Sequence, residues 1–165
     1  MANKKQRVKY FVSYASRNKK LADEFLGQFK EITKPSKRYE YSCWRDRAIL
    51  AGENWHEKIQ EAISKCDFGL LLISPAFLGS QYIKEHELPY FLGNKGKHVM
   101  PVLLQRVSFE KHDLLGLEEK QIFRLEKPGF KEPRAYGELK KARREDFVYE
   151  FFLQVEHSLD KLFDN

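Results

Sequence analysis

Short apolar runs alternate with amphipathic segments along most of the chain. Runs rich in β-branched and aromatic residues predict strands at 8–13, 39–44, 68–74 and 98–104, with a weaker fifth strand at 121–125. The run 68–74 is continuous in Leu and Ile, which is typical of a central strand covered on both faces. The run 98–104 contains Pro101, which favours a position near the sheet edge or a bulge.

Apolar residues at helical spacing predict helices between these strands. The first helix follows Ser16 or Asn18, and the second follows Asn54, because these residue types cap helix N-termini. A third helix begins near Gln81, a short one is expected within 105–120, and a final helix covers about 145–163. The predicted core face of that final helix consists of Val148, Phe151, Phe152, Val155, Leu159, Leu162 and Phe163.

This alternation predicts an α/β fold of the flavodoxin-like, three-layer type. We expect a five-stranded, mainly parallel sheet in the order 2-1-3-4-5 with helices on both faces. One domain should occupy residues 1–165, with a core over about 8–125 and a closing helix, and it can be a piece of a longer protein. Ligands of such sheets bind beyond the carboxyl ends of the strands at the switch point, which selects the loops 13–18 and 74–80.

One acid of the helix after the third strand lies on its apolar side. At about 100° per residue, Ile83, Tyr90 and Phe91 share one side of this helix, and Glu87 falls between them. Glu85 points away from that stripe. A buried carboxylate is costly unless a neighbour satisfies it or it faces a cavity in which it acts. Because the helix starts at the crevice, Glu87 is the first candidate for a functional residue.

Other proteins of this architecture require residues that the chain lacks. A phosphoacceptor domain needs aspartates after strands one and three, where this chain has Ser13 and Ser74. No Gly-rich phosphate loop and no GxSxG elbow occur. Cys43 and Cys66 are far apart in sequence, and no CxxC or HxxxH spacing is present, so we expect reduced core thiols and no metal site.

The charge balance limits the partners. A net charge of +6 and a pI near 9.2 suit an anionic partner, but the basic residues are dispersed. The densest group, at 140–144, lacks the aromatic or Gly pattern of a nucleic-acid module, so no nucleic-acid partner is expected. No run reaches the roughly 18 apolar residues of a membrane span, and the basic N-terminus leads into a strand. We therefore expect no membrane partner and a cytoplasmic location.

Three stretches carry a family resemblance. FVSYASRN at 11–18, YSCWRDRAILAGENWHEKIQEAI at 41–63 and SPAFLGSQYIKEHEL at 74–88 resemble sequence motifs of TIR (Toll/interleukin-1 receptor) domains. The second stretch is similar to the region that contains the family's BB loop, and the third is similar to the bacterial type. The resemblance covers residues from Val8 to about Leu125, and the family's third motif is not found in recognisable form near the last helix.

The resemblance implies an activity. Many TIR domains cleave NAD⁺ at the nicotinamide–ribose bond with a Glu on the helix after strand three, and Glu87 matches that position. It implies nicotinamide plus ADP-ribose or cyclic ADP-ribose as products, NAD⁺ as substrate without a further cofactor, and a role in bacterial immune or virulence signalling. Tyr82 precedes Glu87 by five residues, where many members have a spacing of four, which leaves Glu85 or His86 as the alternative for that position. The candidate substrate-binding residues are Ser13, Tyr14, Ser16, Trp44, Arg45, Asp46, Trp55 and Tyr82.

The resemblance also implies self-association into a homo-oligomer or filament. Family enzymes are commonly active only when the BB loop of one copy packs near the site of the next. In this chain the apolar tip of that loop is Ile49, Leu50, Ala51 and Gly52. One alternative is a noncatalytic scaffold that acts through TIR–TIR contacts of the same loop. Another is a nucleoside deoxyribosyltransferase-like enzyme, which would make the BB-loop match a coincidence.

Overall fold

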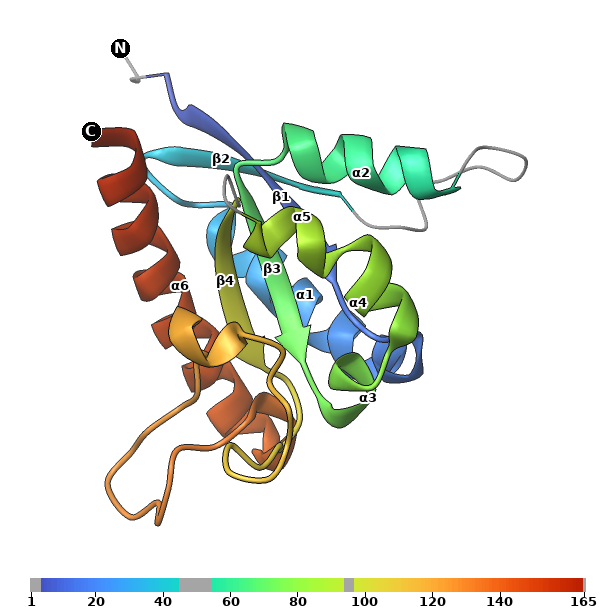
Figure 1. Ribbon diagram of the computed structural model, residues 1–165. Coiled ribbons are helices and arrows are strands. Elements are labelled where there is room, and N and C mark those ends of the chain that lie inside the picture. The colour runs from blue at the N-terminus through green and yellow to red at the C-terminus, as the bar shows by residue number, and fades with distance from the viewer. Residues whose placement is uncertain (1–3, 45–54, 94–96, 165) are drawn as a thin grey trace.

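The computed structural model describes residues 4–44, 55–93 and 97–164, which form one parallel sheet with helices on both faces (Figure 1). Its strands are β1 (Gln6–Ser13), β2 (Tyr39–Trp44), β3 (Phe68–Ile73) and β4 (His98–Leu103). Within the described residues the order is β2-β1-β3-β4, with every neighbouring pair parallel. The α/β class and the positions of the first four strands are therefore confirmed.

The prediction of a fifth strand at 121–125 is wrong. Phe123 pairs with β4 only at one bridge, in which its N–H donates to Pro101 O at 2.8 Å and its carbonyl accepts from Leu103 N at 2.9 Å. Gln121 has a φ of 53°, which interrupts the extended backbone before this bridge. Leu125 already pairs antiparallel with Arg134. The segment turns away from β4 after a single pair, so the described sheet has four strands instead of five.

The edge position of the proline-containing strand is confirmed. β4 has β3 on one side, where Pro101 aligns with Leu71. The carbonyl of Pro101 points to the other side, toward Phe123. Since the N–H and C=O of one strand residue point to the same side, the N–H that proline lacks would also face outward. The proline therefore costs β3 no hydrogen bond.

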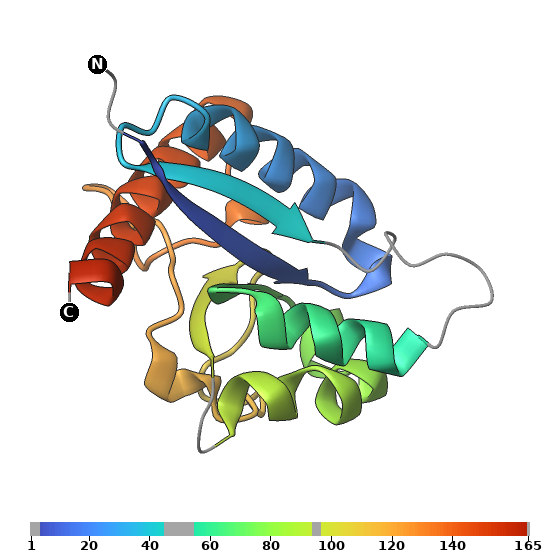
Figure 2. The ribbon, with the colours of Figure 1, turned by 90° about the horizontal axis from the view of Figure 1, so that it is seen from above.

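The helices form two layers around this sheet (Figure 2). On one face lie α1 (Lys19–Thr33) and α6 (Lys141–Asp164), and on the other lie α2 (Trp55–Lys65), α3 (Pro75–Leu78), α4 (Gln81–His86) and α5 (Leu88–Leu92). Short 3₁₀ helices occur at Ser16–Asn18, Leu117–Lys120 and Tyr136–Glu138. Among the described residues, no helix has both the length and the apolar character of a membrane span.

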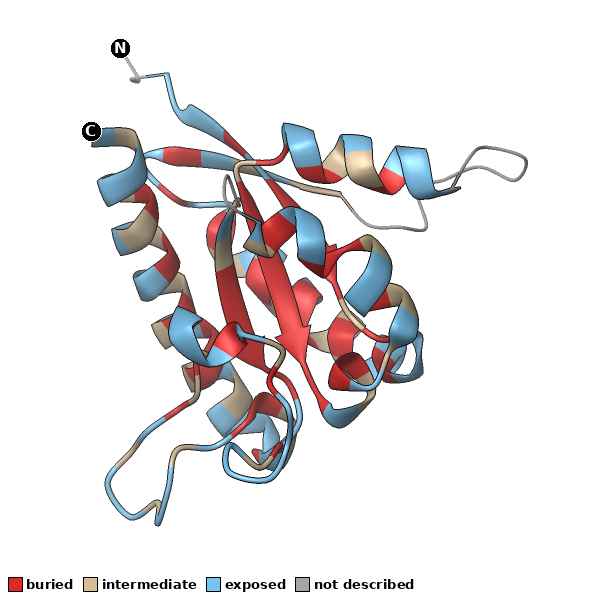
Figure 3. Cartoon of the chain, viewed as in Figure 1, coloured by how far each residue is buried: buried red, intermediate tan, exposed pale blue. Residues whose placement is uncertain are grey.

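Alternating residues of the strands point to opposite faces of the sheet and pack into two hydrophobic cores. Val8, Tyr10 and Val12 of β1 face α1 and α6, whereas Phe11 belongs to the core under α2 to α5. All six residues of β3 are buried, as its apolar run predicted (Figure 3). Each face of the sheet is thus covered, and the carboxyl ends of β1 and β3 meet at one edge.

α6 buries most of its predicted core face. Val148, Phe151, Val155 and Leu159 are buried, and Phe152 and Phe163 are half-buried. The prediction for Leu162 is wrong, because its side chain is exposed. At this end of the helix it is Phe163 that turns to the sheet, where its ring lies 6.0 Å from the ring of Tyr39.

Carboxylates of α6 bind hydroxyl groups at β2. Tyr39 donates to Asp160 at 2.6 Å, and both Tyr41 and Ser36 donate to Glu156. Burial, and then the hydrogen bond to Glu156, raise the pKa of Tyr41 well above its usual value, so this hydroxyl stays protonated and continues to donate. The closing helix is therefore fixed to the edge strand by oriented polar contacts as well as by apolar packing.

Close packing at Gly69 predicts opposite effects of two Gly→Ala substitutions. A Cβ at Gly69 of β3 would lie 2.3 Å from the ring of Phe91 in α5, whereas at exposed Gly27 of α1 it would meet nothing within 4 Å. We expect Gly69→Ala to lower the free energy of unfolding by about 1–3 kcal/mol through overpacking. Gly27→Ala should raise it by about 0.5–1 kcal/mol through better helix propensity. Urea denaturation of both variants measures this, and a stabilised Gly69→Ala protein would contradict the packing described.

Candidate functional site

Two serines divide the segment after β3 into short helices. Ser74 Oγ accepts a hydrogen bond from Phe77 N at 3.0 Å and caps α3, in which Pro75 occupies the first turn. Ser80 Oγ accepts from Ile83 N at 3.2 Å and caps α4. The segment therefore bends at each serine and stays close to the carboxyl end of β3.

A second break falls at Glu87, so the prediction of one continuous helix from Gln81 is wrong. Glu87 has φ −120° and ψ −56°, and it lies between α4 and α5. Pro89 explains the break, because it has no N–H to donate and its ring would collide with the carbonyl of residue 85 in a continuous helix. The change of direction also leaves Tyr90 42% exposed, although the helical pattern placed it on the apolar side.

The break leaves Glu87 buried. Glu87 is 7% exposed, and buried Ile83, Leu88 and Phe91 flank it in the same segment. The side chain of nearby Glu85 is 55% exposed and accepts a hydrogen bond from Gln81 Nε2. Carboxylates are rarely buried to this extent without a specific role or partner. Of the two acids, only Glu87 lies within the protein.

Polar side chains join the strand ends at the predicted switch point. Ser74 Oγ donates to Asn18 Oδ1 at 2.6 Å, and Asn18 Nδ2 donates to Gln105 Oε1 at 3.0 Å. Asn18 occupies the position before α1 but makes no side-chain capping bond there, so its predicted role as a cap is wrong. Gln105 was not identified from sequence, although it follows β4 at the same edge of the sheet. The three residues hold the loops after β1, β3 and β4 together.

Ser13 ends β1 at the same edge of the sheet. It is 1% exposed, and within the described part of the chain its Oγ has no hydrogen-bond partner. An unsatisfied buried hydroxyl carries a free-energy cost, so it is unusual in a folded protein. Phe11 and Ala15, two residues away on either side, belong to the core under α2 to α5, on the same face of the sheet as the segment that bears Glu87.

The comparisons with known proteins agree with this architecture. The model of the TIR domain family matches residues 11–139, which is most of the chain. The chain belongs to the TIR domain family. A curated relative, the uncharacterized protein y4lF of Sinorhizobium fredii (strain NBRC 101917 / NGR234), is 32% identical over 78 residues. That match covers 47% of this chain and 23% of the relative, so the chain spans about a quarter of the relative's length.

Three aromatic rings lie between α2 and α4 of the TIR domain. The ring of Tyr82 lies 4.8 Å from that of His86 and 5.8 Å from that of His56, and the two imidazoles are stacked at 4.1 Å. Tyr82 was a sequence candidate for substrate binding, whereas neither histidine was a candidate for that role. The signal for His86 was its position four residues after Tyr82, which puts both rings on one side of α4. This group positions α2 against the segment that carries Glu87.

Three other candidates differ in burial and in the core on which they pack. The half-buried ring of Tyr14 packs on the core under α1 and α6, which is the opposite face of the sheet. Ser16 is exposed in the 3₁₀ turn that precedes α1. Trp44 ends β2 and stacks on Phe11 with ring centres 5.0 Å apart. Trp44 packs on the core under α2 to α5, the core to which Ile83, Leu88 and Phe91 also belong.

Several sequence candidates lie outside the described residues. These are Arg45 and Asp46, the loop residues Ile49, Leu50, Ala51 and Gly52, the cap Asn54, and the side chain of Trp55. Their roles stay predictions. Among the residues that the structure describes, no group of three or more His, Cys, Asp or Glu side chains is placed to hold a metal ion.

The Asn18–Ser74–Gln105 group predicts that removal of the Ser74 hydroxyl destabilises the protein more than removal of an exposed serine hydroxyl. Ser74→Ala loses the cap of α3 and leaves the Asn18 side chain without its donor, so it should lower the free energy of unfolding by about 1–3 kcal/mol. Ser64→Ala is the matched control, because that exposed hydroxyl only binds a carbonyl of its own helix. It should change stability by less than about 0.5 kcal/mol. Equal losses in urea denaturation would contradict the role given to Ser74.

Proposed function

We propose that this TIR domain cleaves the nicotinamide–ribose bond of NAD⁺ and that Glu87 is its catalytic residue. The observation that supports the proposal is the burial of this one acid at the break between α4 and α5. The segment that bears it follows the central strand β3, at the switch point where α/β sheets bind ligands. Membership of a family that includes NAD⁺-cleaving enzymes adds to this support.

The reaction suits a single carboxylate. In NAD⁺ the nicotinamide nitrogen is positively charged, so the N1–C1′ electron pair passes to that nitrogen and nicotinamide leaves without protonation. The positive charge then develops on the ribose, as in glycoside cleavage. A negative carboxylate placed beside that ribose in a site that excludes water stabilises the developing charge. Attack of water at C1′ gives ADP-ribose and a proton, and attack by an atom of the ADP-ribose itself gives a cyclic product.

The neighbouring residues would bind the substrate. The Ser13 hydroxyl, which is buried at the end of β1, is available to a ribose hydroxyl or phosphate oxygen. Tyr82 supplies an aromatic ring five residues before Glu87, on α4. The further proposed contacts come from Tyr14, Ser16, Trp44, Arg45, Asp46 and Trp55. NAD⁺ is the substrate in this scheme, and no additional cofactor takes part.

We further propose that assembly controls this activity. The loop tip at 49–52 would pack against a second TIR domain, because an exposed apolar tip favours association. A dilute monomer should then cleave NAD⁺ slowly, and a homo-oligomer or filament should cleave it faster. Such switching would suit a role in bacterial immune or virulence signalling, in the cytoplasm.

Removal of either acid near the break tests the assignment of Glu87. Glu87→Ala should slow the release of nicotinamide from NAD⁺ by at least about 100-fold, because one preorganised electrostatic group commonly contributes that much. Glu85→Ala is the matched control on α4, and its exposed side chain should be dispensable, with less than about a twofold change. The rates are measured by chromatography on proteins forced to oligomerise by a fused trimeric coiled coil.

Two outcomes would contradict the proposal. Cleavage by Glu87→Ala at the parent rate would remove Glu87 from the mechanism. Absence of cleavage by the parent protein, even when it is oligomeric, would instead favour a noncatalytic scaffold that acts through TIR–TIR contacts. Circular dichroism of both variants checks that the comparison is made between folded proteins.

A further inference from the structure

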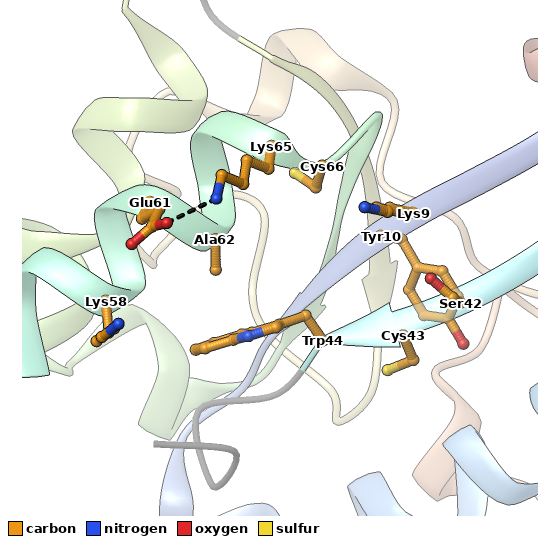
Figure 4. A pocket seen from close by; sticks show the side chains of 10 residues that line it. All are labelled: Lys9, Tyr10, Ser42, Cys43, Trp44, Lys58, Glu61, Ala62, Lys65 and Cys66. Carbon is orange, nitrogen blue, oxygen red and sulfur yellow. Dashed lines mark hydrogen bonds and ion pairs between the residues drawn. The ribbon is translucent and has the colours of Figure 1, made fainter. Parts of the chain in front are cut away.

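A groove separates the edge strand β2 from helix α2 (Figure 4). Its volume is about 450 Å³, within the range of small-molecule sites in proteins, about 300–1,000 Å³. We call it the β2–α2 groove. It is lined by Lys9, Tyr10, Ser42, Cys43, Trp44, Lys58, Glu61, Ala62, Lys65 and Cys66.

This groove and Glu87 lie on different sides of α2. The lining residues of α2 are Lys58, Glu61, Ala62 and Lys65, at the spacing that places side chains on one helical face. The ring of His56, which is nearly half a turn away from that face, contacts Tyr82 and His86 of α4 instead. The groove therefore lies away from Glu87. Among its lining residues, Trp44 is also a proposed contact of NAD⁺.

The groove carries an excess of positive charge. Three lysines line it, against one carboxylate, Glu61, which pairs with Lys65 at 2.6 Å. Lys9 extends from β1 and Lys58 from α2, on either side of the space that Figure 4 shows. Burial raises the pKa of the Cys66 thiol to about 11, so this side chain is neutral at physiological pH. The lining therefore favours an anion.

A flat aromatic surface lies between the lysines. The indole of Trp44 extends from the end of β2 beneath α2, and Ala62 points toward it from the helix (Figure 4). Stacking on Phe11, with ring planes 15° apart, holds the indole in a fixed orientation. The small side chain of Ala62 leaves room beside the ring. A rigid indole flanked by ammonium groups suits a ligand that combines a planar ring with a phosphate.

We propose that the β2–α2 groove binds a mononucleotide, with its base on the indole of Trp44 and its phosphate bound by the lysines that line the groove. The groove has one aromatic platform and the volume of a small-molecule site, which favours a single nucleotide over a nucleic-acid strand. The site gives this TIR domain a place to bind a nucleotide that is independent of Glu87.

Titration with adenosine monophosphate tests this site through the indole N–H signals of ¹⁵N-labelled protein. The chain has two tryptophans, so Trp55→Phe leaves one indole signal and identifies that of Trp44. The monophosphate should shift the Trp44 signal saturably. Ribose 5-phosphate should bind at least about tenfold more weakly, because it lacks the stacking base. A Trp44 signal that stays unchanged, or equal affinity for the two compounds, would overturn the proposal.

Charge reversal distinguishes the groove from a general effect of the basic protein. Lys58→Glu should weaken binding of adenosine monophosphate by at least about tenfold. Lys37→Glu makes the same change of charge at an exposed lysine that does not line the groove, and it should alter the affinity by less than about twofold. Equal effects of the two variants would show that net charge is responsible and would overturn the assignment.

Two further measurements keep this proposal separate from the NAD⁺ reaction and from nucleic-acid binding. Glu87→Ala should bind adenosine monophosphate with unchanged affinity, whether or not the parent protein cleaves NAD⁺. Loss of binding in that variant would place the nucleotide near Glu87 and refute the groove. A single-stranded oligonucleotide that bound much more tightly than the mononucleotide would replace the proposed ligand with a nucleic acid.

Discussion

The contact between Gly69 and the ring of Phe91 determines how the α3–α5 segment lies on the sheet. β3 is buried along its whole length, and the absence of a side chain at Gly69 lets the Phe91 ring approach its backbone. Phe91 also contacts Phe11 of β1, with ring centres 5.7 Å apart. α5 is thereby held over the two central strands. Glu87, one turn before Phe91, is carried inward with it.

The sequence predicted those features of the fold that depend on residues close together in the chain. The first four strands follow from apolar runs, and the edge position of β4 follows from Pro101, because both effects act within one element. The segment 121–125 has strand-like composition, but its pairing depends on the left-handed backbone of Gln121 and on Arg134, which lies further along the chain. Pairing between distant residues cannot be obtained from periodicity.

The candidate site shows the same limit. Helical periodicity selected Glu87 by assuming one continuous helix. That helix is broken at Pro89, which turns Tyr90 outward, so the burial of Glu87 has a different cause. The switch-point rule selected the loops that contain Asn18 and Ser74. It did not predict that these side chains bind one another and Gln105, because such contacts depend on how the loops pack together.

α2 lies between two chemically different regions, with the buried acid on one side and the basic groove on the other. In the proposed reaction the Glu87 carboxylate acts on the developing charge of the ribose, beyond any part in holding the substrate. The most direct test compares NAD⁺ binding and single-turnover cleavage by oligomeric Glu87→Gln and parent protein. For Glu87→Gln we expect an equilibrium constant for binding within about threefold of the parent value and cleavage slower by at least about 100-fold. Loss of binding and cleavage to the same extent would contradict this role of Glu87.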